Sequence, residues 1–121
     1  MTALTPAVPV GAVPAPRRGQ TGGPRWRALL EARWRERLAV LTDLSVEFHD
    51  SAALAPGIQG RDSQRALSRR AVVARYALAE TDKALHRLAA GEFGHCEDCA
   101  SDIPEARLLA EPEARYCERC A

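Results

Sequence analysis

Four cysteines near the C-terminus are the residues whose type and spacing predict chemistry. They form two pairs, Cys96 with Cys99 and Cys117 with Cys120, and two residues separate the members of each pair. Two such pairs are typical of a zinc site, because each pair makes a short chelating turn and four thiolates complete a tetrahedral ion. We therefore expect one structural Zn²⁺, bound by these four cysteines, with no open position for a substrate.

Other uses of these residues fit the sequence less well. Disulfides are typical of secreted chains, and a redox pair is expected within a βαβ pattern that this sequence lacks. Histidine can also bind zinc, but His49, His86 and His95 are isolated, and four cysteines already complete the ligand set. We expect these histidines at the surface or at helix ends. With no nucleophile–base pair and no open metal position, the sequence does not predict an enzyme.

Glycine and proline divide the rest of the chain. The first 24 residues contain five prolines and four glycines, which predicts a disordered tail over residues 1–23. Pro24 begins the next stretch, and neither glycine nor proline occurs again before about Ala53. A cluster of helix breakers follows at residues 56–60. A second such stretch runs from about residue 62 to 90, and Gly91 is expected to cap its end.

Large or small apolar side chains recur every three or four residues in both stretches, which predicts two helices packed as a coiled coil. The stripes are Leu30, Trp34, Arg37, Leu41, Leu44 and Phe48, then Leu67, Ala71, Ala74, Leu78, Thr81, Leu85 and Leu88, with Arg37 and Thr81 as their polar members. Facing residues of an antiparallel hairpin have a constant number sum, and a sum of 115, as for Leu44 with Ala71, pairs the stripes throughout. The alternative, a compact helical bundle, needs helices that the chain does not offer.

These patterns predict a mainly α fold with three parts. They are a disordered Pro/Gly-rich tail (1–23), a long antiparallel coiled-coil hairpin (24–90) with its tip near residues 50–62, and a small four-cysteine zinc-finger module (91–121). Residues 76–121, which include this module, hold five bases and ten acids, so non-specific binding of the module to phosphates is not expected. No apolar stretch approaches the roughly 18 residues needed to span a bilayer, so we expect no membrane contact.

The residues around the cysteines form a denser pattern. It reads Ala84-Leu85-x-Arg87-Leu88-x-x-Gly91-x-Phe93-Gly94-x-Cys96-x-x-Cys99, then Ile103-Pro104-x-x-Arg107-Leu108-x-Ala110-x-Pro112-x-Ala114-x-x-Cys117-x-x-Cys120. This pattern closely resembles the DksA/TraR family of RNA polymerase-binding regulators with a C4-type zinc finger. Ala100 departs from it, because the family usually has glycine after the second cysteine.

The resemblance implies a cytoplasmic transcription regulator that binds RNA polymerase, with the hairpin tip inserted into the secondary channel. It implies a monomer that does not recognise DNA sequence. The family's tip pattern is Asp-x-x-Asp-x-Ala, and aligning its alanine with Ala66 puts Arg61 and Gln64 at the aspartate positions. Asp50 and Asp62 are the acids near the turn and the candidate partner-binding residues.

Two alternatives stay open at this stage. The chain could be a zinc-ribbon adaptor that binds another protein, or nucleic acid directly. Asp62 could also serve as the N-cap or a first-turn acid of the second helix, rather than as a partner-binding residue.

Overall fold

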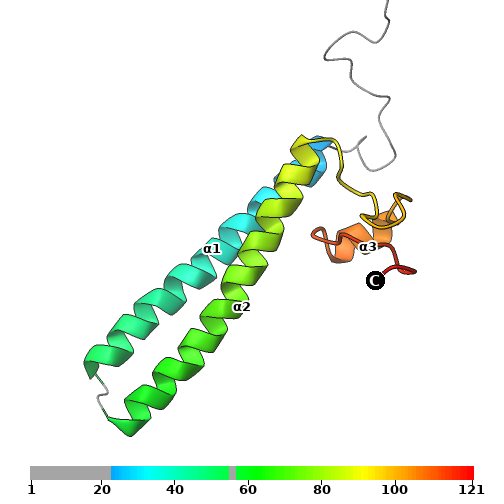
Figure 1. Ribbon diagram of the computed structural model, residues 1–121. Helices are drawn as coiled ribbons and strands as arrows, with labels where there is room; N and C mark the ends of the chain where they lie inside the picture. The colour runs from blue at the N-terminus through cyan, green and yellow to red at the C-terminus, as the bar shows by residue number, and fades with distance from the viewer. Residues whose placement is uncertain (1–22, 55–56) are drawn as a thin grey trace, which may run out of the picture.

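The fold is a long helical hairpin with a small module beside its base (Figure 1). The computed structural model describes residues 23–54 and 57–121, so the predicted tail lies outside the described residues except for Gly23. The helices are α1 (Gly23–Leu54), α2 (Ile58–Ala89) and α3 (Glu105–Ala110). In the described ranges there is no β-strand, only one isolated bridge. The predicted mainly α hairpin, followed by a cysteine module, is confirmed.

The apolar stripes form the seam between α1 and α2. Every stripe position of both helices is buried or half-buried, and Leu44, Ala74 and Thr81 are among the most deeply buried. Arg37 donates hydrogen bonds to the carbonyl of Ala77 (3.0 Å) and to Oγ1 of Thr81 (2.7 Å). These two residues lie one position before and three positions after Leu78, the partner predicted for Arg37. The cross-helix contacts of Arg37 are therefore consistent with the predicted register.

The turn at the tip is shorter than the sequence suggested. Gly57 has φ 104°, a left-handed conformation that favours glycine, and α2 begins at the next residue. The backbone N–H of Arg61 donates to the carbonyl of Gly57 at 2.9 Å, so Gly60 lies within the first turn and does not delay the helix. The expected start near Asp62 is four residues too late. Asp62 is consequently neither the N-cap nor a first-turn residue, and that alternative is wrong.

The C-terminal end of α2 is capped as expected. Gly91 has φ 76°, and its N–H donates to the carbonyl of Leu88 (3.2 Å), while the N–H of Glu92 donates to that of Arg87 (2.8 Å). This pair of bonds is the Schellman arrangement, which satisfies the last carbonyls of the helix. The chain leaves α2 in a direction that returns the cysteine module to the hairpin base.

One hydrophobic core joins the base of the hairpin to the module. Trp26 of α1 packs against Phe93 of the module, with ring centroids 5.4 Å apart. Aromatic pairs at this separation add to the stabilisation from burial. The buried members of this core come from α1, α2 and the module: Trp26, Leu30, Ala84, Phe93, Ile103, Leu108 and Ala114. The hairpin base therefore positions the module.

None of the helices in the described ranges contains a window apolar enough to cross a membrane.

Candidate metal centre

The two cysteine pairs lie on two similar backbone turns. The N–H of Ala100 donates to the carbonyl of Cys96 (2.9 Å), and the N–H of Ala121 donates to that of Cys117 (2.9 Å). Each turn brings two thiols to the same side of the chain. The loop that contains α3 then folds the second turn against the first, as the N–H of Glu97 donating to the carbonyl of Arg115 (2.9 Å) shows.

The four sulfur atoms form one cluster. The Sγ atoms of Cys96, Cys99, Cys117 and Cys120 all lie within 4.8 Å of one another, and none forms a disulfide. Sulfurs placed about 2.3 Å from a tetrahedral zinc ion are about 3.8 Å apart. The Sγ atoms of Cys99 and Cys117 are 3.7 Å apart, close to that spacing. The donor set therefore fits one structural zinc ion, with four thiolates and no free position.

The electrostatics of the cluster also favour a cation. Burial raises the pKa of the Cys117 thiol, but hydrogen bonds from the Cys120 backbone and from neighbouring thiols outweigh it and bring this pKa to about 6. Hydrogen bonding to Cys117 instead raises the pKa of the Cys120 thiol to about 12. Within this hydrogen-bonded pair, the first proton is lost more easily than the second. A bound zinc ion favours the thiolate form of every ligand.

Ala100 adopts a conformation that glycine would adopt more easily. Its φ is 61°, and it is the only non-glycine residue with positive φ in the described ranges. This conformation costs an L-residue about 1 kcal/mol or somewhat more. Ala100 follows directly after Cys99, and its own N–H closes the first turn. The zinc turn therefore keeps its shape although the family's usual glycine is replaced.

His95 is buried rather than exposed, which corrects the expectation of a surface or helix-end position. Its Nδ1 lies 3.0 Å from Oδ1 of Asp102, and the two residues form the isolated β-bridge. The neighbouring bond, from the N–H of Ile103 to the carbonyl of Gly94 (2.8 Å), draws this pair into the module. His95 is not part of the sulfur cluster. His49 and His86 are exposed, as expected.

A buried carboxylate, Glu113, fastens the module to both long helices, and the sequence analysis missed it. Its side chain is 7% exposed. Arg33 of α1 donates two hydrogen bonds to it, from Nε (2.8 Å) and from Nη2 (3.0 Å). Arg37 donates from Nη1 (3.0 Å) and Thr81 of α2 from its hydroxyl (2.8 Å). We call these four residues the Glu113 clamp. Although burial acts to raise the pKa of Glu113, these donors hold it below its usual range.

One signal in the sequence pointed toward the clamp. Arg37 and Thr81 occupy positions in otherwise apolar stripes, and a polar side chain in a seam needs a partner. Arg115 and Glu97 form a second ion pair near the clamp. Arg115 donates hydrogen bonds to both carboxylate oxygens of Glu97 (2.8 and 3.0 Å). Arg87 of α2 reaches the backbone carbonyl of Glu113 at 3.3 Å. The module is therefore held by polar contacts as well as by the shared core.

Asp50 lies near the end of α1 and Asp62 near the start of α2. These helix ends form the tip of the hairpin, at the far end from the cysteine module (Figure 1). Asp50 is exposed in the last turns of α1 and has no ion pair among the described residues. Asp62 is exposed in the second turn of α2, and its carboxylate is 3.5 Å from Nη1 of Arg65. Both carboxylates face solvent, and neither caps a helix.

Known proteins share these features in sequence and in fold. Residues 91–121 match the sequence family described as the prokaryotic dksA/traR C4-type zinc finger. The solved structure of transcription factor DksA2 from Pseudomonas aeruginosa superposes with a TM-score of 0.76 and 25% identity, over 83% of this chain and 80% of that one. An uncharacterized protein of Aquifex aeolicus (strain VF5) is 50% identical over 44 residues, which are 36% of this chain and 30% of that protein.

The matching segment thus spans less than a third of the curated relative, whereas the structural match spans most of both chains. The zinc finger matches in sequence, the hairpin and module match in fold, and the four clustered thiols fit one zinc ion. The chain thus carries a dksA/traR-type C4 zinc finger at residues 91–121, on a helical hairpin with the fold of DksA2.

Proposed function

We propose that this regulator binds bacterial RNA polymerase and inserts the hairpin tip into the secondary channel. The observation that carries the proposal is the DksA-like fold, which covers the hairpin and the module together. The helices α1 and α2 have 32 residues each, so the hairpin reaches about 48 Å from base to tip. A rod of this length can present a few tip residues deep inside a channel while its base stays outside.

We propose that Asp50 and Asp62 are the residues that act at the polymerase active centre. Two carboxylates facing solvent at a tip can perturb the coordination of a catalytic Mg²⁺ or the loops around it, because hard cations prefer oxygen ligands. The structural alternative for Asp62 is removed, since α2 begins four residues before it. Its pair with Arg65 joins two exposed side chains, and such pairs contribute little to stability. Neither acid is therefore required by the fold.

The remaining assignments follow from the same proposal. We assign the structural zinc ion to Cys96, Cys99, Cys117 and Cys120, whose sulfur atoms form the cluster. We place the protein in the cytoplasm, where its polymerase partner is found, and we propose that it acts as a monomer. No base-reading element is proposed, since the module is acidic and contacts the hairpin through its core.

The test combines binding with transcription in a purified system. Wild-type protein should co-elute with polymerase core enzyme at micromolar concentration and change the yield of initiated transcripts. Asp50→Asn with Asp62→Asn should bind within about twofold of wild type, because Asn keeps the size of the side chain, yet lose most of the transcriptional effect.

The matched control is Glu31→Gln with Glu36→Gln, which removes the same charge from exposed positions of α1 away from the tip. It should behave like the wild type. Separation of wild-type protein from polymerase would contradict the binding proposal. An unchanged transcriptional effect in the Asp50/Asp62 variant would show that the tip carboxylates are not the effectors.

A further inference from the structure

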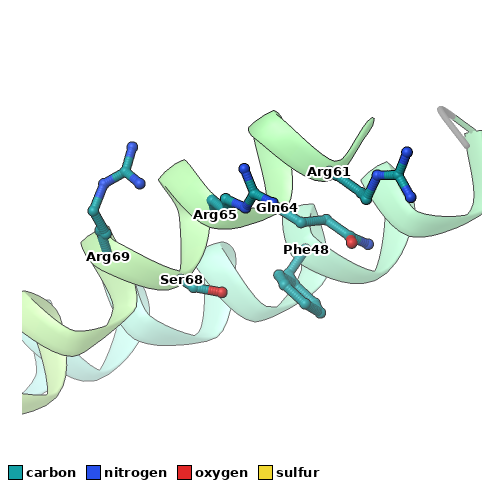
Figure 2. Close-up of a pocket in the computed structure, with 6 residues that line it drawn as sticks. All are labelled: Phe48, Arg61, Gln64, Arg65, Ser68 and Arg69. Carbon is teal, nitrogen blue, oxygen red and sulfur yellow. The ribbon is translucent and has the colours of Figure 1, made fainter. Parts of the chain in front are cut away.

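An open groove runs along one side of the tip half of the hairpin. The part nearer the tip has a volume of about 470 Å³ (Figure 2), and its lining consists of Phe48 from α1 with Arg61, Gln64, Arg65, Ser68 and Arg69 from α2. A second part of about 310 Å³ shares Phe48 and Ser68 with the first and extends to Val72 and Arg75. The two parts therefore form one continuous feature, which lies at the opposite end of the molecule from the acidic zinc module.

The α2 side of this groove is strongly basic. The first 18 residues of α2 hold five arginines and a single acid, Asp62. Arg61, Arg65 and Arg69 are spaced by four residues, so they lie along one face of the helix with a rise of about 6 Å between them. Arg61 and Arg69 have no ion pair among the described residues. Their guanidinium groups are therefore available to anions from outside the protein.

Aromatic and apolar surface accompanies the arginines. Phe48 is half-buried, and in Figure 2 its ring lies in the groove on the side where Gln64 and Ser68 also point. Val72 and Tyr76 are 62% and 66% exposed, and their spacing continues the face of α2 that carries Arg65 and Arg69. A ligand that fits this surface has repeated negative charges together with flat apolar groups.

We propose that the groove binds single-stranded nucleic acid without reading its sequence. Arg61, Arg65 and Arg69 contact successive phosphates, and a base stacks against the ring of Phe48. This combination of a basic track and an aromatic platform is the one that sequence-independent single-strand binding uses. An acidic protein segment without aromatic residues would satisfy the arginines but would leave the ring of Phe48 without a stacking partner. The inference does not depend on polymerase binding.

The experiment is fluorescence anisotropy with a labelled short oligouridylate and the full chain, titrated between about 50 and 200 mM salt. Three phosphate contacts predict a slope of log K against log salt of about −2. Arg61→Gln with Arg69→Gln should reduce that slope to about −0.7 and weaken binding at low salt by about tenfold or more. Phe48→Leu keeps an apolar side chain but removes the stacking face, and should weaken binding at least about fivefold.

The matched control, Arg27→Gln with Arg35→Gln, removes the same charge from exposed positions of α1 outside the groove and should bind like the wild type. Equal loss in this control would overturn the proposal, because it would show general charge attraction. Tight binding of an oligoglutamate of equal charge, with no effect of Phe48→Leu, would also overturn it and assign the groove to acidic protein segments. No binding of the oligouridylate by wild-type protein at low salt would also overturn the proposal. Circular dichroism and zinc content confirm that each variant is folded, and polymerase co-elution of the same variants separates this result from the proposed function.

Discussion

Replacing Glu113 by glutamine removes the charge at the centre of the contacts between the zinc module and the hairpin. The glutamine keeps nearly the same size, so the hydrophobic core is undisturbed. It loses one acceptor oxygen, and its NH₂ group faces donors. Arg33 loses its bidentate partner, while Arg37 keeps its bonds to Ala77 and Thr81.

The magnitude follows from the burial of the partners. Removing one member of a buried ion pair costs about 3–5 kcal/mol, because the other charge is left without compensation. Glu113 is 7% exposed, but Arg33 and Arg37 are each 28% exposed, so water solvates them in part once the carboxylate is gone. We therefore expect a loss of about 2–3 kcal/mol in the free energy of unfolding. For a domain of this size, that loss lowers Tm by about 10–20 °C.

Urea unfolding followed by circular dichroism measures this loss, with zinc content checked in each sample. The midpoint should fall while the m-value stays unchanged. Glu111→Gln is the matched control, since Glu111 is exposed two residues away and should shift stability by less than about 0.5 kcal/mol. Arg33→Gln combined with Glu113→Gln should cost less than the two single changes added together. A Glu113→Gln protein as stable as the control would refute the assigned role of the clamp.

The remaining predictions concern the zinc ion, pH and the seam. Purified protein should contain one equivalent of zinc, and Cys117→Ser should lower that content and loosen the module while most of the helical signal survives, as metal analysis and circular dichroism can show. Because the pKa of Glu113 is lower in the folded state than in the unfolded state, its contribution is complete above about pH 4.3 and is lost as pH falls through the folded-state value. The difference in unfolding free energy between wild type and Glu113→Gln should therefore narrow below about pH 4, and a constant difference would contradict the assignment. Leu44→Ala should cost about 2–4 kcal/mol in urea unfolding, since Leu44 is 4% exposed in the seam, whereas the exposed Val46→Ala should cost little.

The hairpin and the zinc site were predictable because their signals are local and periodic. Leu30 and Leu44 recur at helical spacing on one side of the chain, and breakers at 56–57 separate two uninterrupted stretches. The cysteine pairs carry their own spacing rule. The start of α2 was misplaced because Gly60 was counted as a breaker, whereas α2 begins directly after Gly57, whose φ is positive.

The contacts between module and hairpin were not predictable from the sequence alone. Glu113 lies 80 residues from Arg33 and 32 from Thr81, and nothing around it distinguishes it from an exposed acid. Its burial depends on how the module docks, which is a property of the tertiary fold. The seam showed the same limit at its base. Ala84 is fully buried while the predicted stripe residue Leu85 is only partly buried, because Phe93 and its neighbours pack on that side.

Site-specific photocrosslinking tests most directly the central claim, that the hairpin tip enters the polymerase secondary channel. A benzophenone amino acid at Ala52, exposed near the tip, is compared with the same probe at Ala106, exposed on α3 beside the base. With polymerase core enzyme, the tip probe should crosslink to peptides that line the secondary channel, and the base probe should not reach them. Crosslinks from Ala52 only to the outer surface of polymerase, or the same peptides from both probes, would contradict the claim.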